Sequence, residues 1–147
     1  MTGEGTPRKL ADVHCHFVPG VDDGAPDLAT AMRWLRRVFE EGVRRMALTP
    51  HLPASRADGS DRRRAEEAFR ELRASVGEEL PELEIRLAFE LRLDGPAVDP
   101  ADRGLWLGTG GHLLVEYDFF RLPDGDPAAP MEELLAAGRT PVLAHPE

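Results

Sequence analysis

The residues Asp12-Val13-His14-Cys15-His16 place two histidines at the end of a strand-like run. Successive side chains of a strand point to opposite faces, so Asp12, His14 and His16 share one face while Val13 and Cys15 share the other. Two imidazoles about 7 Å apart at the end of a strand can hold one divalent cation, given a carboxylate from elsewhere. The stretch therefore predicts a strand that ends in a metal site.

Four later strand-like runs also end in a side chain that can bind a metal. These side chains are His51, Glu90, Glu116 and His145. In a parallel β/α barrel the carboxyl ends of the strands open onto one mouth, where catalytic groups gather. Imidazole and carboxylate ligands together suit Mn²⁺, Fe²⁺ or Zn²⁺. The five strand ends together predict metal-assisted hydrolysis.

Strand-like and helix-like segments alternate along the chain. We expect strands over residues 9–16, 43–49, 83–93, 112–117 and 141–144, and helices over residues 26–41, 60–76 and 130–137. The segment 94–111 is rich in glycine and proline and is expected to be irregular, with a short helical turn near Ala101. Repeated strand–helix–strand units favour an α/β fold with a parallel sheet and right-handed crossovers.

The length of 147 residues fits one domain with a sizeable core. We expect residues 1–9 to be a flexible tail and residues 10–147 to form the domain, and no apolar run is long enough to cross a bilayer. A single cysteine cannot form an intramolecular disulfide, so a reducing cytoplasm is the expected location. The net charge of −9 argues against a nucleic-acid partner.

Cys15 follows His14, and a His-Cys pair opens the loop of cysteine-dependent phosphatases. That loop needs an arginine six residues after the cysteine, where this chain has Val21. Cys15 also faces away from His14 and His16, so we expect it to be a small core residue. His112 starts its strand after two glycines and is likewise expected to be structural.

Two further groups of charged residues are expected to support the structure. Asp22 and Asp23 are expected to form a turn and to orient His14 or His16, rather than to bind a metal directly. The run Arg62–Arg64 stands among acidic residues on a helix, which predicts a solvated, salt-bridged face.

The order of these motifs resembles the PHP (polymerase and histidinol phosphatase) superfamily. The shared pattern is Asp-Val-His-Cys-His at 12–16, Val-Asp-Asp-Gly at 21–24, Thr-Pro-His at 49–51, glutamate at 90, Leu-Val-Glu at 114–116 and Ala-His-Pro-Glu at 144–147. The longer runs at 19–24 and 113–116 favour the bacterial manganese-dependent tyrosine phosphatases of capsule and exopolysaccharide operons over histidinol phosphatases. The resemblance covers residues 10–147.

The resemblance implies a distorted, TIM-like β/α barrel, of which this chain supplies the N-terminal portion with about five parallel strands. It implies a cytoplasmic phosphotyrosine-protein phosphatase that acts on the tail of a bacterial tyrosine autokinase controlling polysaccharide export. A metal-activated hydroxide would attack phosphorus, since metal-bound water can have a pKa of about 7. Up to three ions are implied, with Mn²⁺ first and Fe²⁺ or Zn²⁺ as alternatives.

The implied metal ligands are all histidines and glutamates at strand ends: His14, His16, His51, Glu90, Glu116 and His145. The two histidines of the first strand would share one ion. The glutamate at position 90 would bridge to a second ion, which also takes the ligands at positions 116 and 145. The histidine at position 51 would belong to the third ion. Beyond the metal-activated hydroxide, the resemblance assigns no catalytic group.

The chain departs from the family pattern in two places. Leu52 stands where many relatives have a second histidine, which weakens the third ion site. The chain also stops at Glu147, before the arginine and the Asp-x-His motif of the family, and a β/α barrel typically needs roughly 200–250 residues. We therefore expect a C-terminally truncated barrel that binds metal weakly, is either marginally stable or self-associated through an open sheet edge, and has little activity. Two alternatives stay open: another PHP phosphoesterase, such as a histidinol phosphatase, or an inactive metal-binding fragment.

Overall fold

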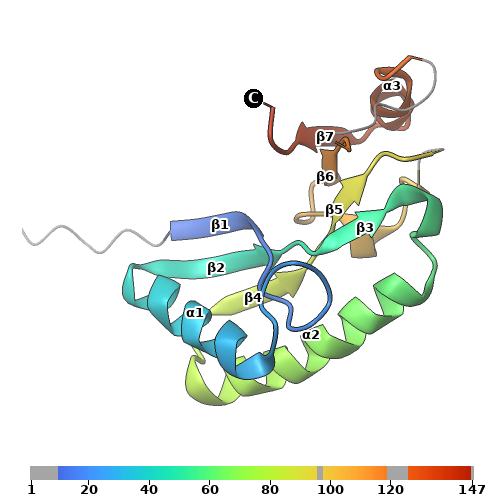
Figure 1. The fold of residues 1–147 in the computed structure, drawn as a ribbon. Coiled ribbons are helices and arrows are strands. Elements are labelled where there is room, and N and C mark those ends of the chain that lie inside the picture. Colours follow the sequence, from blue (N-terminus) through green and yellow to red (C-terminus); the bar gives the residue numbers. More distant parts are fainter. Residues whose placement is uncertain (1–9, 96–97, 119–125, 147) are drawn as a thin grey trace, which may run out of the picture.

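The fold is built on parallel strands. The computed structural model describes residues 10–95, 98–118 and 126–146. Three strands form one sheet in the order β1-β2-β4: β1 (Leu10–Cys15), β2 (Val43–Leu48) and β4 (Glu84–Leu87). Four strands form a second sheet in the order β3-β5-β6-β7: β3 (His51–Pro53), β5 (Glu90–Arg92), β6 (His112–Glu116) and β7 (Thr140–Leu143). Every neighbouring pair is parallel (Figure 1). The tail expected at residues 1–9 lies outside the described residues.

The two sheets belong to one succession of strands, because β2 runs on into β3 and β4 runs on into β5. Backbone hydrogen bonds bridge both interruptions: the Ala88 N–H donates to the Leu48 carbonyl (2.9 Å), and the Glu90 N–H donates to the Pro50 carbonyl (3.1 Å). Pro50 has no N–H, so it cannot continue the ladder between β2 and β3. Each strand path therefore lies beside the next one along the chain, which is the neighbour order of a β/α barrel. This arrangement confirms the five expected parallel strands.

The first two helices pack against each other and against the three-stranded sheet, on the same side of it (Figure 1). They are α1 (Leu28–Glu40) and α2 (Ser60–Glu79). Helix α1 begins two residues later than expected, because the Asp27 carboxylate accepts a hydrogen bond from the Thr30 N–H (2.7 Å) and thereby caps the helix. Within the described part of the chain, no helix has the length and apolar character needed to cross a membrane.

The remaining helical segments lie beside the second sheet. The 3₁₀ helix η1 (Ala54–Arg56) follows β3, and helix α3 (Ala129–Ala136) packs against β7. The segment expected to be irregular holds the 3₁₀ helix η2 (Arg103–Leu105), close to the turn expected near Ala101.

The apolar core has two parts that follow the two sheets. One part lies between α1, α2 and the three-stranded sheet and contains the fully buried Leu35, Leu48 and Leu72. Cys15 belongs to this part, as expected from its face of β1. The other part surrounds the second sheet and contains the fully buried Leu52 and Leu91. Each sheet therefore has its own part of the apolar core.

Candidate metal centre

The expected ligands come together where β1, β2, β4, β6 and β7 end. His14 is on β1 and His16 directly follows it. His51 and Glu90 are the first residues of β3 and β5 and are register partners in that sheet. Two further candidates complete the set: Glu116 ends β6, and His145 follows β7.

Glu90 is the hub of the candidate metal centre, with 0% of its side chain exposed. Its Oε2 atom lies 3.1 Å from Nε2 of His14 and 3.1 Å from Nε2 of His16. The same oxygen lies 3.2 Å from Nδ1 of His51, while Oε1 lies 3.3 Å from Nε2 of His145. Four imidazoles from three parts of the chain thus converge on one carboxylate.

The Glu90 carboxylate is buried without the hydrogen bonds that a buried carboxylate normally has. The imidazole nitrogens lie at ion-pair distance, but among the described residues none donates a well-aligned hydrogen bond to either oxygen. Burial acts to raise the pKa of Glu90, yet the contact with His16 and the charges of His14 and His51 outweigh it and lower that pKa. An ionised carboxylate in such a place is costly unless a cation accompanies it. The site therefore has the chemistry of a metal-binding site.

Three groups of potential ligand atoms lie within 4.8 Å of one another. They are His14, Glu90 and His145; His16, His51 and Glu90; and His16, Asp22 and Asp23. Glu90 belongs to two groups and His16 belongs to two. These groups divide the histidines differently from the division implied by the family resemblance, and the assignment of ligands to individual ions stays a prediction.

Asp22 lies where the sequence suggests, beside His16. Its Oδ2 atom is 2.7 Å from Nδ1 of His16, and this hydrogen bond, followed by the contact with Glu90, raises the pKa of His16 to about 10. Asp22 also accepts hydrogen bonds from the backbone N–H groups of Gly24 (3.0 Å) and His51 (3.1 Å). It therefore fixes both the His16 ring and the start of β3.

The turn at Gly24 passes too close to the centre for any side chain. A Cβ atom at this position would lie 1.9 Å from the His16 carbonyl oxygen and 2.5 Å from the His16 Cβ atom. Glycine is thus needed here for close approach of two backbone segments. This requirement explains why a glycine follows the two aspartates.

Glu116 contacts His51 and is only slightly exposed. Its Oε1 atom lies 2.8 Å from Nδ1 of His51, and this contact raises the pKa of His51 above its ordinary value. Glu116 is therefore placed at the centre through His51, whereas the resemblance groups it with His145.

His145 has a left-handed backbone, with φ at 50°. A non-glycine residue in this region costs of order 1–3 kcal/mol and is held there only when its surroundings demand it. The Ala144 N–H donates to the Val115 carbonyl (2.8 Å), which fixes the chain just before the turn. The strained turn directs the His145 ring toward Glu90.

The two residues expected to be structural lie away from the ligand atoms. Cys15 is buried, and burial raises its pKa to about 12, so its thiol is not the nucleophile of a cysteine phosphatase. His112 is exposed at the start of β6, at the opposite end of that strand from Glu116.

The sequence interpretation missed a group of arginines beside the centre. A hollow of about 200 Å³ is lined by His51 and Asp22 together with Arg56, Arg64 and Arg92. Arg92 could have been found, because it lies two residues after Glu90 on the same strand. Arg64 could not, because its approach depends on how α2 packs.

Comparison with known proteins places the chain in a family. A family model of capsular polysaccharide synthesis proteins, CpsB/CapC, matches residues 10–147. The tyrosine-protein phosphatase YwqE of Bacillus subtilis (strain 168) is 30% identical over 140 residues, which make up 94% of this chain and 54% of YwqE. A crystal structure from work on YwqE and on CpsB from Streptococcus pneumoniae, both described as unique metal-dependent tyrosine phosphatases, superposes with a TM-score of 0.71 at 28% identity. That match covers 93% of this chain and 56% of the other.

The structural match confirms the α/β fold with parallel strands, and the chain spans about half the length of the relatives it matches. The order of the motifs, the convergence of their side chains and the family match agree. The chain belongs to the CpsB/CapC family of capsular polysaccharide synthesis proteins.

Proposed function

We propose that this chain carries the metal centre of a protein-tyrosine phosphatase that acts on a bacterial tyrosine kinase controlling capsule or exopolysaccharide synthesis. Membership of the CpsB/CapC family supports the proposal, and the B. subtilis relative is a tyrosine-protein phosphatase. The chain spans about half of that relative, so metal binding and turnover have to be tested separately.

The strongest support is the Glu90 carboxylate, which is fully buried and faces four imidazoles. A hydrogen-bonded core network would satisfy its two oxygens with aligned donors, but none of the described residues does so. Divalent ions held between the carboxylate and the imidazoles would compensate the buried charge. Nitrogen and oxygen donors without a thiolate suit Mn²⁺, Fe²⁺ or Zn²⁺, and we propose Mn²⁺.

The residues that would hold the ions are those at the strand ends: His14, His16, His51, Glu90, Glu116 and His145. When bound, such ions lower the pKa of water and neutralise phosphoryl oxygens. Asp22 orients His16 for this role, because its carboxylate accepts the hydrogen bond from Nδ1, so that Nε2, which faces Glu90, is the nitrogen that would bind an ion. The contact with Glu116 positions the His51 ring in the same way.

Metal binding is tested by titrating Mn²⁺ into the metal-free chain in a calorimeter. We expect the wild-type chain and His112→Gln to bind alike, since His112 lies outside the centre, and Glu90→Gln to lose binding. Equal binding by Glu90→Gln and the wild type would contradict the proposed centre.

Turnover is tested with a phosphotyrosyl peptide and with histidinol phosphate, in the presence of Mn²⁺ and again after excess EDTA. The proposal predicts faster turnover of the peptide, and its loss with EDTA. Preference for histidinol phosphate would assign the chain to a different PHP phosphoesterase. Binding of Mn²⁺ without turnover of either substrate would retain the metal centre and refute catalysis by this chain.

A further inference from the structure

The arginine-lined hollow beside the metal centre holds more positive charge than its own carboxylates neutralise. Three guanidinium groups line it, those of Arg56, Arg64 and Arg92, with the carboxylates of Asp22 and Asp61. Asp61 lies 3.4 Å from Arg56, and Asp22 lies 2.7 Å from His16, so both carboxylates are already engaged. Among the residues that the structure describes, neither Arg64 nor Arg92 lies within ion-pair distance of a carboxylate, although the charge of Arg92 contributes to the lowered pKa of the nearby Asp94.

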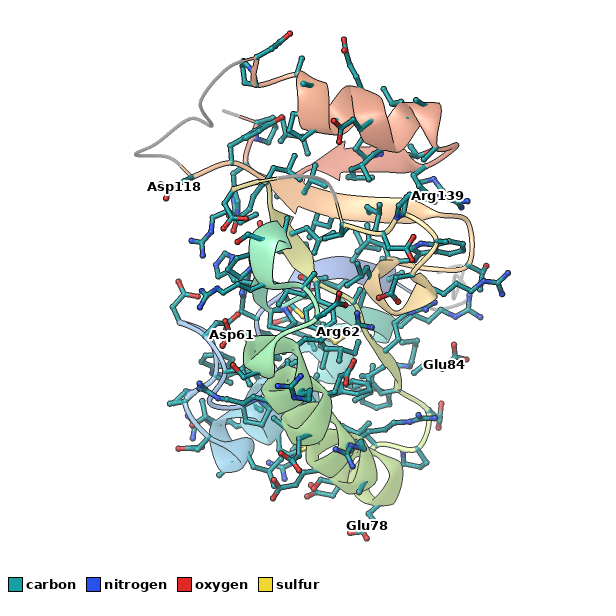
Figure 2. All side chains as sticks on the ribbon, turned by 90° about the vertical axis from the view of Figure 1, so that its right-hand side faces the viewer. Asp61, Arg62, Glu78, Glu84, Asp118 and Arg139 are labelled. Atoms are coloured by element: carbon teal, nitrogen blue, oxygen red, sulfur yellow. The ribbon has the colours of Figure 1, made fainter. Side chains whose placement is uncertain are left out.

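This excess is unusual because the chain as a whole carries a net charge of −9. Arg62, in the same triplet as Arg64, shows the contrast. Arg62 forms ion pairs with Glu66 (2.8 Å) and with Asp102, as expected for a salt-bridged helix face. Figure 2 shows Asp61 and Arg62 at the start of α2, and Arg62 reaches Asp102 in the segment that contains η2. The expected salt bridges are therefore present at Arg62, which is partly buried, whereas Arg64 is exposed to solvent without a salt bridge among the described residues.

The walls of the hollow are tied to the elements that carry the metal centre. The Arg64 guanidinium donates to the Gly20 carbonyl, in the same loop as Asp22. Arg92 is half-buried and lies two residues after Glu90 on β5, so its side chain shares the face of that strand with the hub carboxylate. Asp22 and His51 belong both to the wall of the hollow and to the metal centre. A substrate bound at the ions would bring its neighbouring residues to these guanidiniums.

We propose that the hollow binds the carboxylate of an acidic residue close to the phosphotyrosine of the substrate, an inference that rests on the proposed phosphatase function. A volume of about 200 Å³ accommodates one side chain and not a peptide segment. The planar fork of a guanidinium donates two parallel hydrogen bonds to a carboxylate. The hollow would thus select acidic peptides at a site that does not itself contain the ions.

The experiment uses the whole chain in EDTA and two phosphate-free fluorescent peptides that differ only in having glutamate or glutamine beside the tyrosine. Fluorescence anisotropy should show tighter binding of the glutamate peptide, and the difference should fall as salt is added. Replacement of the half-buried Arg92 by glutamine should weaken binding of the glutamate peptide about fivefold to tenfold, which corresponds to about 1–1.4 kcal/mol. Arg64→Gln should weaken it about twofold to threefold, because Arg64 is more exposed.

Arg63→Gln is the matched control, because Arg63 belongs to the same triplet, donates to the Asp58 carbonyl and does not line the hollow. It should bind the glutamate peptide as the wild type does. Arg92→Glu should reverse the preference, so that a lysine peptide binds better than the glutamate peptide. This reversal requires a folded protein, so it separates the charge effect from unfolding.

The outcomes distinguish this inference from the proposed function. Equal binding of both peptides by the wild type, or equal losses in Arg63→Gln and Arg92→Gln, would overturn the acidic-residue site even if phosphotyrosyl peptides were hydrolysed. A different outcome is that inorganic phosphate displaces both peptides while the glutamate and glutamine peptides bind equally. That result would show that the hollow binds the phosphoryl group, and it would also overturn the acidic-residue site. Preferential binding of the glutamate peptide without any turnover would support the site while refuting catalysis.

Discussion

Two regions of the molecule are built in opposite ways. One is the core between α1, α2 and the three-stranded sheet, and the other is the metal centre. Between the two helices and the three-stranded sheet, apolar side chains such as Leu35 and Leu72 fill the interior. At the centre, the buried group is the Glu90 carboxylate, and His145 has a left-handed backbone. The first region is held together by apolar burial, whereas the second gathers a buried carboxylate and imidazoles that are suited to bind a cation. Substitutions in the two regions should therefore affect different measurements.

Glu90→Gln should have the largest effect, and it should appear in metal binding. Glutamine keeps the size of the side chain but loses the charge shared by the two groups of ligand atoms. We expect Mn²⁺ affinity to fall by at least about 100-fold, since even groups that only orient a ligand account for about 10–100-fold. In thermal melts, Mn²⁺ at 100 times its Kd should stabilise the wild type by about 2.7 kcal/mol and should leave Glu90→Gln unchanged. An equal stabilisation of both proteins would mean that the ions bind elsewhere.

Leu35→Ala should have its effect on folding instead. Leu35 is fully buried in the core below the three-stranded sheet, so the substitution leaves a cavity. We expect the free energy of unfolding in urea to fall by about 2–5 kcal/mol. The Mn²⁺ affinity of the folded protein should stay within about twofold of the wild type, because the substituted side chain lies outside the centre. Loss of Mn²⁺ binding in a folded Leu35→Ala protein would show that the two regions are coupled.

The comparison also explains what could be predicted from the sequence. The side chains that converge at the centre were predictable, because a strand places them on one face and parallel strands end at one edge. The fold class followed from the same alternation of strands and helices. The Asp27 side chain caps α1, so the helix begins at Leu28, whereas Pro26 suggests a start two residues earlier.

Other features depended on contacts between segments distant in the sequence. The hydrogen bond from the His51 N–H to Asp22 joins two segments that are 29 residues apart in sequence. The continuation of β2 into β3 depends on Glu90 donating to the carbonyl of Pro50, where a proline suggests the end of a strand. The hollow needs Arg64 from α2 and Arg92 from β5 together. No local pattern could give these approaches, since each arises from packing.

Gly24→Ala should have a smaller effect, and it should be felt in both measurements. The added Cβ atom would overlap the His16 carbonyl, so the loop or β1 must move. We expect a loss of about 1–3 kcal/mol in the free energy of unfolding. Mn²⁺ affinity should fall as well, because His16 is displaced.

Gly77→Ala is the control for Gly24→Ala. Gly77 lies in α2, and nothing lies within 4 Å of a Cβ atom added there. This alanine should stabilise the helix by about 0.4–1 kcal/mol without affecting Mn²⁺ binding. A Gly24→Ala protein that matches the wild type in both measurements would contradict the close approach of the Gly24 turn to His16.

The smallest predicted effect concerns Asp102, which forms an ion pair with Arg62 across the segments after β3 and β5. The contact with Arg62 lowers the pKa of Asp102, so the carboxylate is more acidic in the folded chain than in the unfolded chain. Its contribution to stability is therefore present above the unfolded pKa of about 3.9 and is lost as the pH falls through the lower folded value. Asp102→Asn should reduce the free energy of unfolding at pH 7 by about 0.5–1 kcal/mol.

Asp99→Asn separates the charge of Asp102 from its local hydrogen bond. Both aspartates accept a hydrogen bond from the backbone N–H two residues later, at 2.9 Å, and asparagine can keep that bond. Among the described residues Asp99 forms no ion pair, so Asp99→Asn should unfold in urea as the wild type does at every pH. The deficit of Asp102→Asn should shrink as the pH is lowered from 7 toward 2, because protonation removes the same charge from the wild type. A deficit that stays constant over this range would assign the effect to altered packing around η2 and not to the ion pair.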